Sequence, residues 1–167
     1  MKIAISNSSP LILLAKTNVL EILVYFFDKI YIPPEVYHEV VENGLKRGEG
    51  DAMLIQNLVV NSTIEVKSPE EVKLPLTFKN SLHSGEIEAI SLAYSFSNHP
   101  ILLDDEEARI FARSLGIRVK GTLGLVVNYY QQRQISHNKA ISLLDELNKL
   151  MYLSGDLYSF VLSKLQI

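Results

Sequence analysis

The stretch Pro100-Ile101-Leu102-Leu103-Asp104-Asp105-Glu106-Glu107-Ala108-Arg109 decides the fold that this sequence predicts. Its apolar residues run straight into two aspartates, and apolar residues at helical spacing follow at once. An apolar run without alternation that leads into a helix is typical of a buried parallel strand in an α/β sheet. Ligands of such sheets bind beyond the carboxyl ends of the strands, and Asp104 and Asp105 fall at such an end.

Asp104 and Asp105 have two interpretations. Adjacent carboxylates repel each other unless a cation or a proton lies between them, which favours a cation site. Alternatively, Asp104 is the N-cap of the following helix and Glu107, three residues on, is its capping-box partner. Carboxylates at other strand ends would favour the cation site, because one aspartate alone is well explained as a cap.

Strands and helices alternate along the rest of the chain. Strands are predicted over residues 3–5, 29–32, 100–103 and 117–120, with a weaker edge strand over 63–66. Helical patterns separate them, including 18–27, 35–42, 52–58 and 84–96, and residues 68–81 are predicted to form a long surface connection. This order predicts an α/β fold with a mainly parallel central sheet and helices on both faces.

The size and composition limit the possible classes of protein. A chain of 167 residues fits a single domain over 1–167, with 136–167 as a helical C-terminal part. Cysteine is absent, which excludes disulfides, zinc–thiolate sites and thiol nucleophiles, and fits a cytoplasmic protein. No apolar run is long enough to span a membrane, and the N-terminus does not resemble a signal peptide. The net charge of −3 and the lack of a basic tail mean that any nucleic-acid binding needs a local patch or a metal.

Polar residues recur at comparable places in the predicted fold. Asn7 and the Asp104–Asp105 pair stand at strand ends, whereas Glu39 and Glu86 lie on helices. Hard oxygen ligands in one cleft suit Mg²⁺ or Mn²⁺, which can activate water for attack on a phosphodiester. Each residue also has a plainer explanation: Glu86 as a favourable charge in a first helical turn, and Glu39 as part of a solvated helix face.

Six segments, taken in this order, resemble the PIN domain family, in particular stand-alone PIN proteins related to VapC-type toxin nucleases. The resemblance runs from Ile3 to about Leu162. The family implies a three-layer α/β/α sandwich and a metal-dependent ribonuclease with three or four acidic residues around Mg²⁺ or Mn²⁺. Carried over, Glu39, Glu86 and either Asp105 or Asp104 would hold the metal and serve catalysis. The matching segments are residues 6–12 (SNSSPLI), 32–40 (IPPEVYHEV), 82–90 (LHSGEIEAI), 102–109 (LLDDEEAR), 119–124 (VKGTLG) and 143–147 (LLDEL).

Asn7 departs from the family pattern, which has an aspartate at the end of the first strand. An amide still offers a carbonyl oxygen to a metal, but it carries no charge, so the site should bind a divalent ion more weakly. Two functions therefore remain open. The first is an Mg²⁺- or Mn²⁺-dependent endoribonuclease, as the toxin of a toxin–antitoxin pair. The second is a PIN fold with weakened catalysis that binds RNA or another protein.

The resemblance also implies partners. RNA would be the substrate, an antitoxin protein would be a second partner, and VapC-type relatives form dimers. The segment 18–27 is apolar almost all round, which exceeds what one buried helix face requires. We therefore expect a homodimer through this helix, with burial under the C-terminal helices as the alternative.

Overall fold

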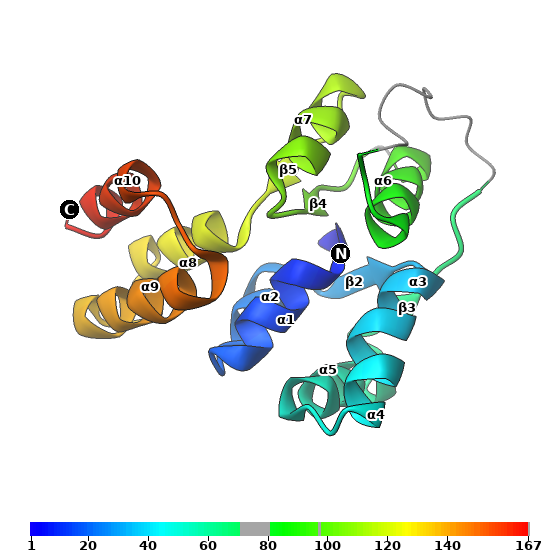
Figure 1. Ribbon diagram of the computed structural model, residues 1–167, viewed down its shortest axis with the longest axis horizontal. Helices are drawn as coiled ribbons and strands as arrows, with labels where there is room; N and C mark the ends of the chain where they lie inside the picture. The colour runs from blue at the N-terminus through cyan, green and yellow to red at the C-terminus, as the bar shows by residue number, and fades with distance from the viewer. Residues whose placement is uncertain (71–80, 97, 167) are drawn as a thin grey trace.

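The computed structural model describes residues 1–70, 81–96 and 98–166 (Figure 1). Five strands form one sheet in the order β3-β2-β1-β4-β5, and every neighbouring pair is parallel. The sheet therefore has β1 at its centre, and β3 and β5 are its edges. The strands are β1 (Ile3–Ser6), β2 (Lys29–Ile32), β3 (Ile64–Val66), β4 (Ile101–Leu102) and β5 (Val119–Lys120).

Helices connect the parallel strands and continue after the last one. Short α-helical and π-helical segments follow β2 directly, and three helices come after β5. The helices are α1 (Ser8–Lys16), α2 (Glu21–Phe26), α3 (Pro34–Tyr37), the π-helix η1 (His38–Asn43), α4 (Gly44–Lys46), α5 (Gly50–Val60), α6 (Ser84–Ser95), α7 (Glu106–Ser114), α8 (Thr122–Gln131), α9 (His137–Met151) and α10 (Gly155–Leu165).

The two faces of the sheet are covered by different helices. Ala4 and Leu102 belong to a core formed with α1, α2, η1, α5, α8 and α9. Ile5, Ile101 and Leu103 belong to a second core formed with α6 and α7. Neighbouring residues of β1 and β4 thus face opposite sides, as the period of two in a strand requires. This arrangement confirms the predicted α/β/α sandwich, and α10 packs on α9 through a smaller cluster at one end (Figure 1).

The strands agree with the predicted segments, but two helical segments differ. The segment 18–27 contains a shorter helix, α2, because Asn18 adopts a positive φ of 55° that interrupts any helix. The segment 35–42 is divided into α3 and the π-helix η1, a change of hydrogen bonding that no sequence pattern signalled. Of the predicted connection over 68–81, residues 71–80 lie outside the described part of the chain.

The helix α2 is only partly covered. Ile22 and Leu23 are fully buried, whereas Val24 and Tyr25 are 49% and 42% exposed. The burial of α2 comes partly from α8, since Tyr25 and Tyr129 contact edge to face with ring centroids 5.2 Å apart. Dimerisation through α2 stays a prediction. Within the described residues, no helix combines the length and apolar character that crossing a bilayer needs.

Candidate acidic site at the carboxyl edge of the sheet

Asn7 follows the last residue of the central strand β1 and is the N-cap of α1. Asn7 is buried, with only 5% of the residue exposed. Its Oδ1 accepts a hydrogen bond from the Ser8 backbone N–H at 2.6 Å. Asparagine suits an N-cap because its oxygen satisfies an otherwise free helix donor. No described residue accepts a hydrogen bond from Nδ2, and the described residues contain no buried side-chain nitrogen without a partner. Nδ2 is therefore at least partly accessible to solvent.

Glu39 approaches the same place from the π-helix η1. The Ser8 hydroxyl donates a hydrogen bond of 2.5 Å to its Oε2, which ties η1 to the start of α1. The side chain of Glu39 is exposed, as the plainer explanation of a solvated helix face expects. However, it is exposed toward a pocket that it shares with Asn7. Wide π-helical turns often occur at functional sites, because the extra residue redirects a side chain.

Glu86 lies in the first turn of α6 and is only 7% exposed. Its Oε2 accepts a hydrogen bond from the His83 backbone N–H at 2.9 Å, which satisfies a free donor at the helix start. Burial raises the pKa of this carboxyl above its ordinary value of 4.5, and the negative charges of Asp105 and Glu39 raise the pKa further. Glu86 is thus a buried carboxylate that two other carboxylates repel.

These side chains line one pocket of about 290 Å³. Gly85 borders the pocket, because a Cβ there would be in van der Waals contact with Glu39 Oε2 at 3.7 Å and with Asn7 Oδ1 at 3.8 Å. Both oxygens are therefore within 4 Å of one point at the surface of α6. The pocket is lined by Asn7, Ser8, Ser9, Glu35, Glu39, Asn43, His83, Ser84, Gly85 and Glu86.

Two contacts hold α3 and α6 together at the mouth of this pocket. Glu88 Oε2 accepts a hydrogen bond from the Glu35 backbone N–H at 3.0 Å, and the Ser84 hydroxyl donates to Glu35 Oε1 at 3.2 Å. Sequence reasoning did not single out Glu35, although it precedes Glu39 by four residues, one helical turn. It also missed Asn43, whose position depends on the π-helix and left no signal.

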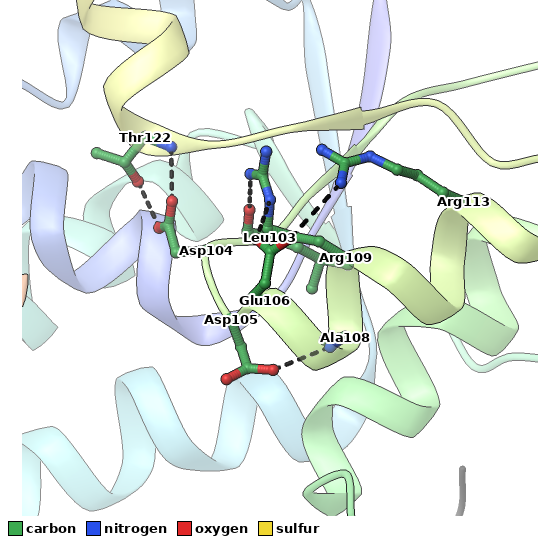
Figure 2. A network of polar contacts seen from close by, with 8 residues as sticks. All are labelled: Leu103, Asp104, Asp105, Glu106, Ala108, Arg109, Arg113 and Thr122. Atoms are coloured by element: carbon green, nitrogen blue, oxygen red, sulfur yellow. Dashed lines mark hydrogen bonds and ion pairs between the residues drawn. The ribbon is translucent and has the colours of Figure 1, made fainter. Parts of the chain in front are cut away.

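The adjacent aspartates Asp104 and Asp105 point to different sides of the β4 end (Figure 2). Asp105 is the N-cap of α7, since its Oδ1 accepts from the Ala108 backbone N–H at 2.9 Å. The predicted cap at Asp104 is therefore wrong by one residue. Asp105 is near enough to Glu86 to raise its pKa. Of the two aspartates, Asp105 is therefore the one whose charge acts on Glu86, although neither aspartate is among the residues that line the acidic pocket.

Asp104 instead holds the start of α8. Its Oδ1 accepts from the Thr122 backbone N–H at 2.7 Å, and its Oδ2 accepts from the Thr122 hydroxyl at 2.6 Å. Burial raises the pKa of Asp104, while the two hydrogen bonds from Thr122 and the charge of Arg109 act in the opposite direction. With both oxygens engaged, Asp104 joins the end of β4 to the N-terminus of α8.

The chemistry of the acidic pocket can be judged from its donor set. Among the described residues, no group of three or more Asp, Glu or His side chains is already arranged closely enough to hold a metal ion. Two of the three charged groups that act on Glu86 are nevertheless carboxylates, Asp105 and Glu39, and the third is His83. Carboxylates are the ligands that Mg²⁺ and Mn²⁺ prefer. Burial is the largest cause of the raised pKa of Glu86, and repulsion from Asp105 and Glu39 adds to it. A divalent cation would relieve this repulsion. The residues present fit a hard divalent ion.

We predict that Glu86→Gln raises the melting temperature of the metal-free protein at neutral pH by a few degrees. A stabilisation of about 1 kcal/mol gives a shift of this size in a domain of this length. Glutamine can still accept the His83 hydrogen bond but removes the repelled charge. Because the folded-state pKa of Glu86 is raised, its ionisation destabilises the fold, and this loss develops as pH rises from about 4.5 through the raised pKa. Melts in EDTA from pH 4 to pH 8 should therefore show a difference that grows with pH. The exposed Glu107→Gln is the control, and equal melting temperatures for Glu86→Gln and wild type at pH 8 would contradict the prediction.

Comparisons with known proteins identify the family. A family model described as a PIN domain matches residues 3–166. Among solved structures, a PilT N-terminus domain protein, SSO1118, from the hyperthermophilic archaeon Sulfolobus solfataricus P2 is similar, with 19% sequence identity and a TM-score of 0.44 over 75% of this chain and 90% of that chain. No curated protein matches the sequence. Since the family model covers almost the whole chain, the protein belongs to the PIN domain family.

Proposed function

We propose that this PIN domain is an Mg²⁺- or Mn²⁺-dependent endoribonuclease that hydrolyses RNA phosphodiesters. The observation that carries the proposal is the carboxyl of Glu86, whose pKa is raised by burial and further by Asp105 and Glu39, and which lines an open pocket together with Glu39 and Asn7. Glu39, Glu86 and Asp105 would hold the ion, which supplies an activated water and neutralises charge on the phosphate. The Ser8 hydroxyl would orient Glu39, and Asp104 would keep α8 in place beside the site.

In this proposal Asn7 contributes no charge to the metal site. Its Oδ1 is already engaged with the Ser8 N–H, which leaves one lone pair of that oxygen and the Nδ2 donor for the pocket. The ion would therefore depend on the three carboxylates, and we expect its affinity to be low for a site of this kind. The toxin role and an antitoxin partner are further parts of the proposal that rest on the family alone, and a homodimer is a part that rests on the family and on the partly exposed α2.

A second candidate function is a PIN fold that binds RNA or a protein without cleaving. The specific observation in its favour is Asn7, because its Oδ1 already accepts a hydrogen bond from the Ser8 N–H and its other polar atom, Nδ2, is a donor that cannot bind a cation. The two candidates differ in what they require of the metal. Only the nuclease needs a bound ion for its activity.

The test is a Mn²⁺ titration followed by calorimetry and by cleavage of a fluorescent single-stranded RNA in the same buffer. We expect saturable Mn²⁺ binding at micromolar to millimolar concentrations, cleavage that rises with site occupancy, and loss of cleavage in EDTA. Saturable Mn²⁺ binding with no cleavage would decide for the binding module. Cleavage that persists in EDTA would contradict the metal-dependent mechanism.

A further inference from the structure

A second and larger cavity lies beside the end of β4. Its volume is about 450 Å³, within the range of pockets that hold small ligands. It lies between α8 and α10, and Asp104 and Gly121 form its wall at the carboxyl ends of β4 and β5. Figure 2 shows the side chains of Asp104 and Asp105 pointing to different sides of this strand end, and Asp105 is near enough to Glu86 to raise its pKa. We infer that the two pockets lie on either side of the β4 end. A chain-like ligand that crosses this end would reach both.

The walls of this cavity combine apolar and aromatic surface. Leu123 and Val127 from α8 face Val161 and Phe160 from α10. The Phe160 ring is 59% exposed although it borders a cavity, so it is a large apolar group without full cover. The side chain of Asn128, also exposed, places an amide at the same wall. The cavity thus has a flat apolar surface with a hydrogen-bonding group beside it.

The charges of the cavity favour an anion. Its two acidic residues are already engaged, Asp104 by Thr122 and Glu106 by Arg109 at 3.5 Å. The ammonium group of Lys120 has no hydrogen-bond or ion-pair partner among the described residues. Lys164 Nζ lies over one face of the Phe160 ring, 5.2 Å from its centre, and no described carboxylate pairs with it. Two exposed lysines are therefore available to an anionic ligand, despite the net charge of −3.

A flat apolar body, a hydrogen-bonding edge and an anionic group are the parts of a nucleotide. We propose that this cavity holds one nucleotide of a single-stranded RNA, with its base on the face of Phe160 that Lys164 does not cover and its phosphates near Lys120 and Lys164. Single-stranded nucleic acids are commonly bound by aromatic stacking together with lysines that follow the backbone. The proposal rests on the proposed function, because the strand that crosses the β4 end from this cavity is the strand that the acidic pocket would cleave.

Binding can be measured without cleavage. A fluorescent 12-nucleotide single-stranded RNA is titrated with each protein in EDTA, and anisotropy gives the dissociation constant at several salt concentrations. We expect Phe160→Ala to weaken binding about fivefold or more through loss of stacking. The logarithm of the association constant falls as the logarithm of salt concentration rises. We expect Lys120→Ala and Lys164→Ala each to make this slope less negative by about 0.7. Matched controls are Lys139→Ala on α9 and Tyr94→Ala on α6, which replace an exposed lysine and an exposed aromatic outside the cavity.

The outcomes separate this inference from the proposed function. If the cavity variants bind RNA more weakly and the control variants do not, the result supports the nucleotide site. This holds even if neither the wild type nor any variant cleaves RNA with Mn²⁺. Equal affinities for wild type, cavity variants and controls would overturn it, even if Mn²⁺-dependent cleavage is found. A nucleoside monophosphate that binds as tightly as the oligonucleotide, with the same loss in Phe160→Ala, would overturn the role of a strand and identify a free nucleotide as the ligand.

Discussion

Glu39→Gln should reduce Mn²⁺-dependent RNA cleavage by about 100-fold or more, because it removes one of three carboxylates proposed to hold the ion. Even residues that only support metal ligands commonly cost 10- to 100-fold when replaced, so a ligand should cost at least the upper value. Glutamine keeps the size of the side chain, and its oxygen can still accept the Ser8 hydrogen bond. The fold should therefore survive, since the exposed Glu39 buries little surface.

Glu42→Gln is the matched control for this experiment. Glu42 lies on the same π-helix but binds His38 at 2.7 Å on the exposed side, and it does not line the pocket. Cleavage by Glu42→Gln should equal that of the wild type. Calorimetry with Mn²⁺ alone should show weaker binding for Glu39→Gln and unchanged binding for Glu42→Gln. If Glu39→Gln retains wild-type cleavage and Mn²⁺ affinity, Glu39 is only a solvated helix residue and the metal centre lies elsewhere.

Asn7→Asp should have the opposite effect and bind Mn²⁺ about tenfold more tightly, or better, with faster cleavage of single-stranded RNA. An aspartate can accept the Ser8 hydrogen bond with one oxygen and present the other, charged, where Asn7 presents an N–H donor. Each further tenfold gain corresponds to about 1.4 kcal/mol, which is modest for one added charge beside a divalent cation. Without metal, the same change should lower stability, since it adds a buried negative charge near Glu86 and Glu39.

Two measurements decide the outcome for Asn7→Asp. Thermal melts with and without Mn²⁺ should show a larger metal-induced increase in melting temperature for Asn7→Asp than for the wild type. Asn7→Ser keeps a capping oxygen without adding charge, so it controls for the cap and should gain no Mn²⁺ affinity. If Asn7→Asp and wild type have equal Mn²⁺ affinity and cleave RNA equally, Asn7 is only a helix cap, and the non-catalytic module becomes the better proposal.

The strands and their order along the chain were readable from the sequence, because buried parallel strands leave continuous apolar runs bounded by turn residues. Ile101 and Leu102 show this most clearly, since both are fully buried in β4. The edge position of β3 was also readable from its alternation, and the pairing of Ile30 with Ile64 places it beside β2 at the border of the sheet. Local patterns were sufficient here because the order of apolar and polar residues within a strand indicates which of its faces are buried.

The details of the acidic site were less readable, because they depend on contacts between distant residues. The sequence named Asn7, Glu39, Glu86 and the aspartate pair, but it could not tell Asp104 from Asp105. The two differ through Thr122, eighteen residues later, which takes up both oxygens of Asp104. Glu35 was missed for a similar reason, since its place at the pocket follows from hydrogen bonds to Ser84 and Glu88 on another helix.

The π-helix η1 limits how this chain can change in length. An α-helix turns about 100° per residue, so removing one residue from η1 would rotate everything beyond it relative to α3. The segment that precedes η1 is fixed by the hydrogen bond between Glu35 and Glu88. The residue that follows η1, Gly44, packs so closely on α5 that a Cβ at Gly44 would lie 2.5 Å from the Cβ of Ala52. A single deletion between these anchors must displace either Glu39 or Gly44. Insertions and deletions in this segment should therefore be tolerated only in pairs that restore the original number of residues.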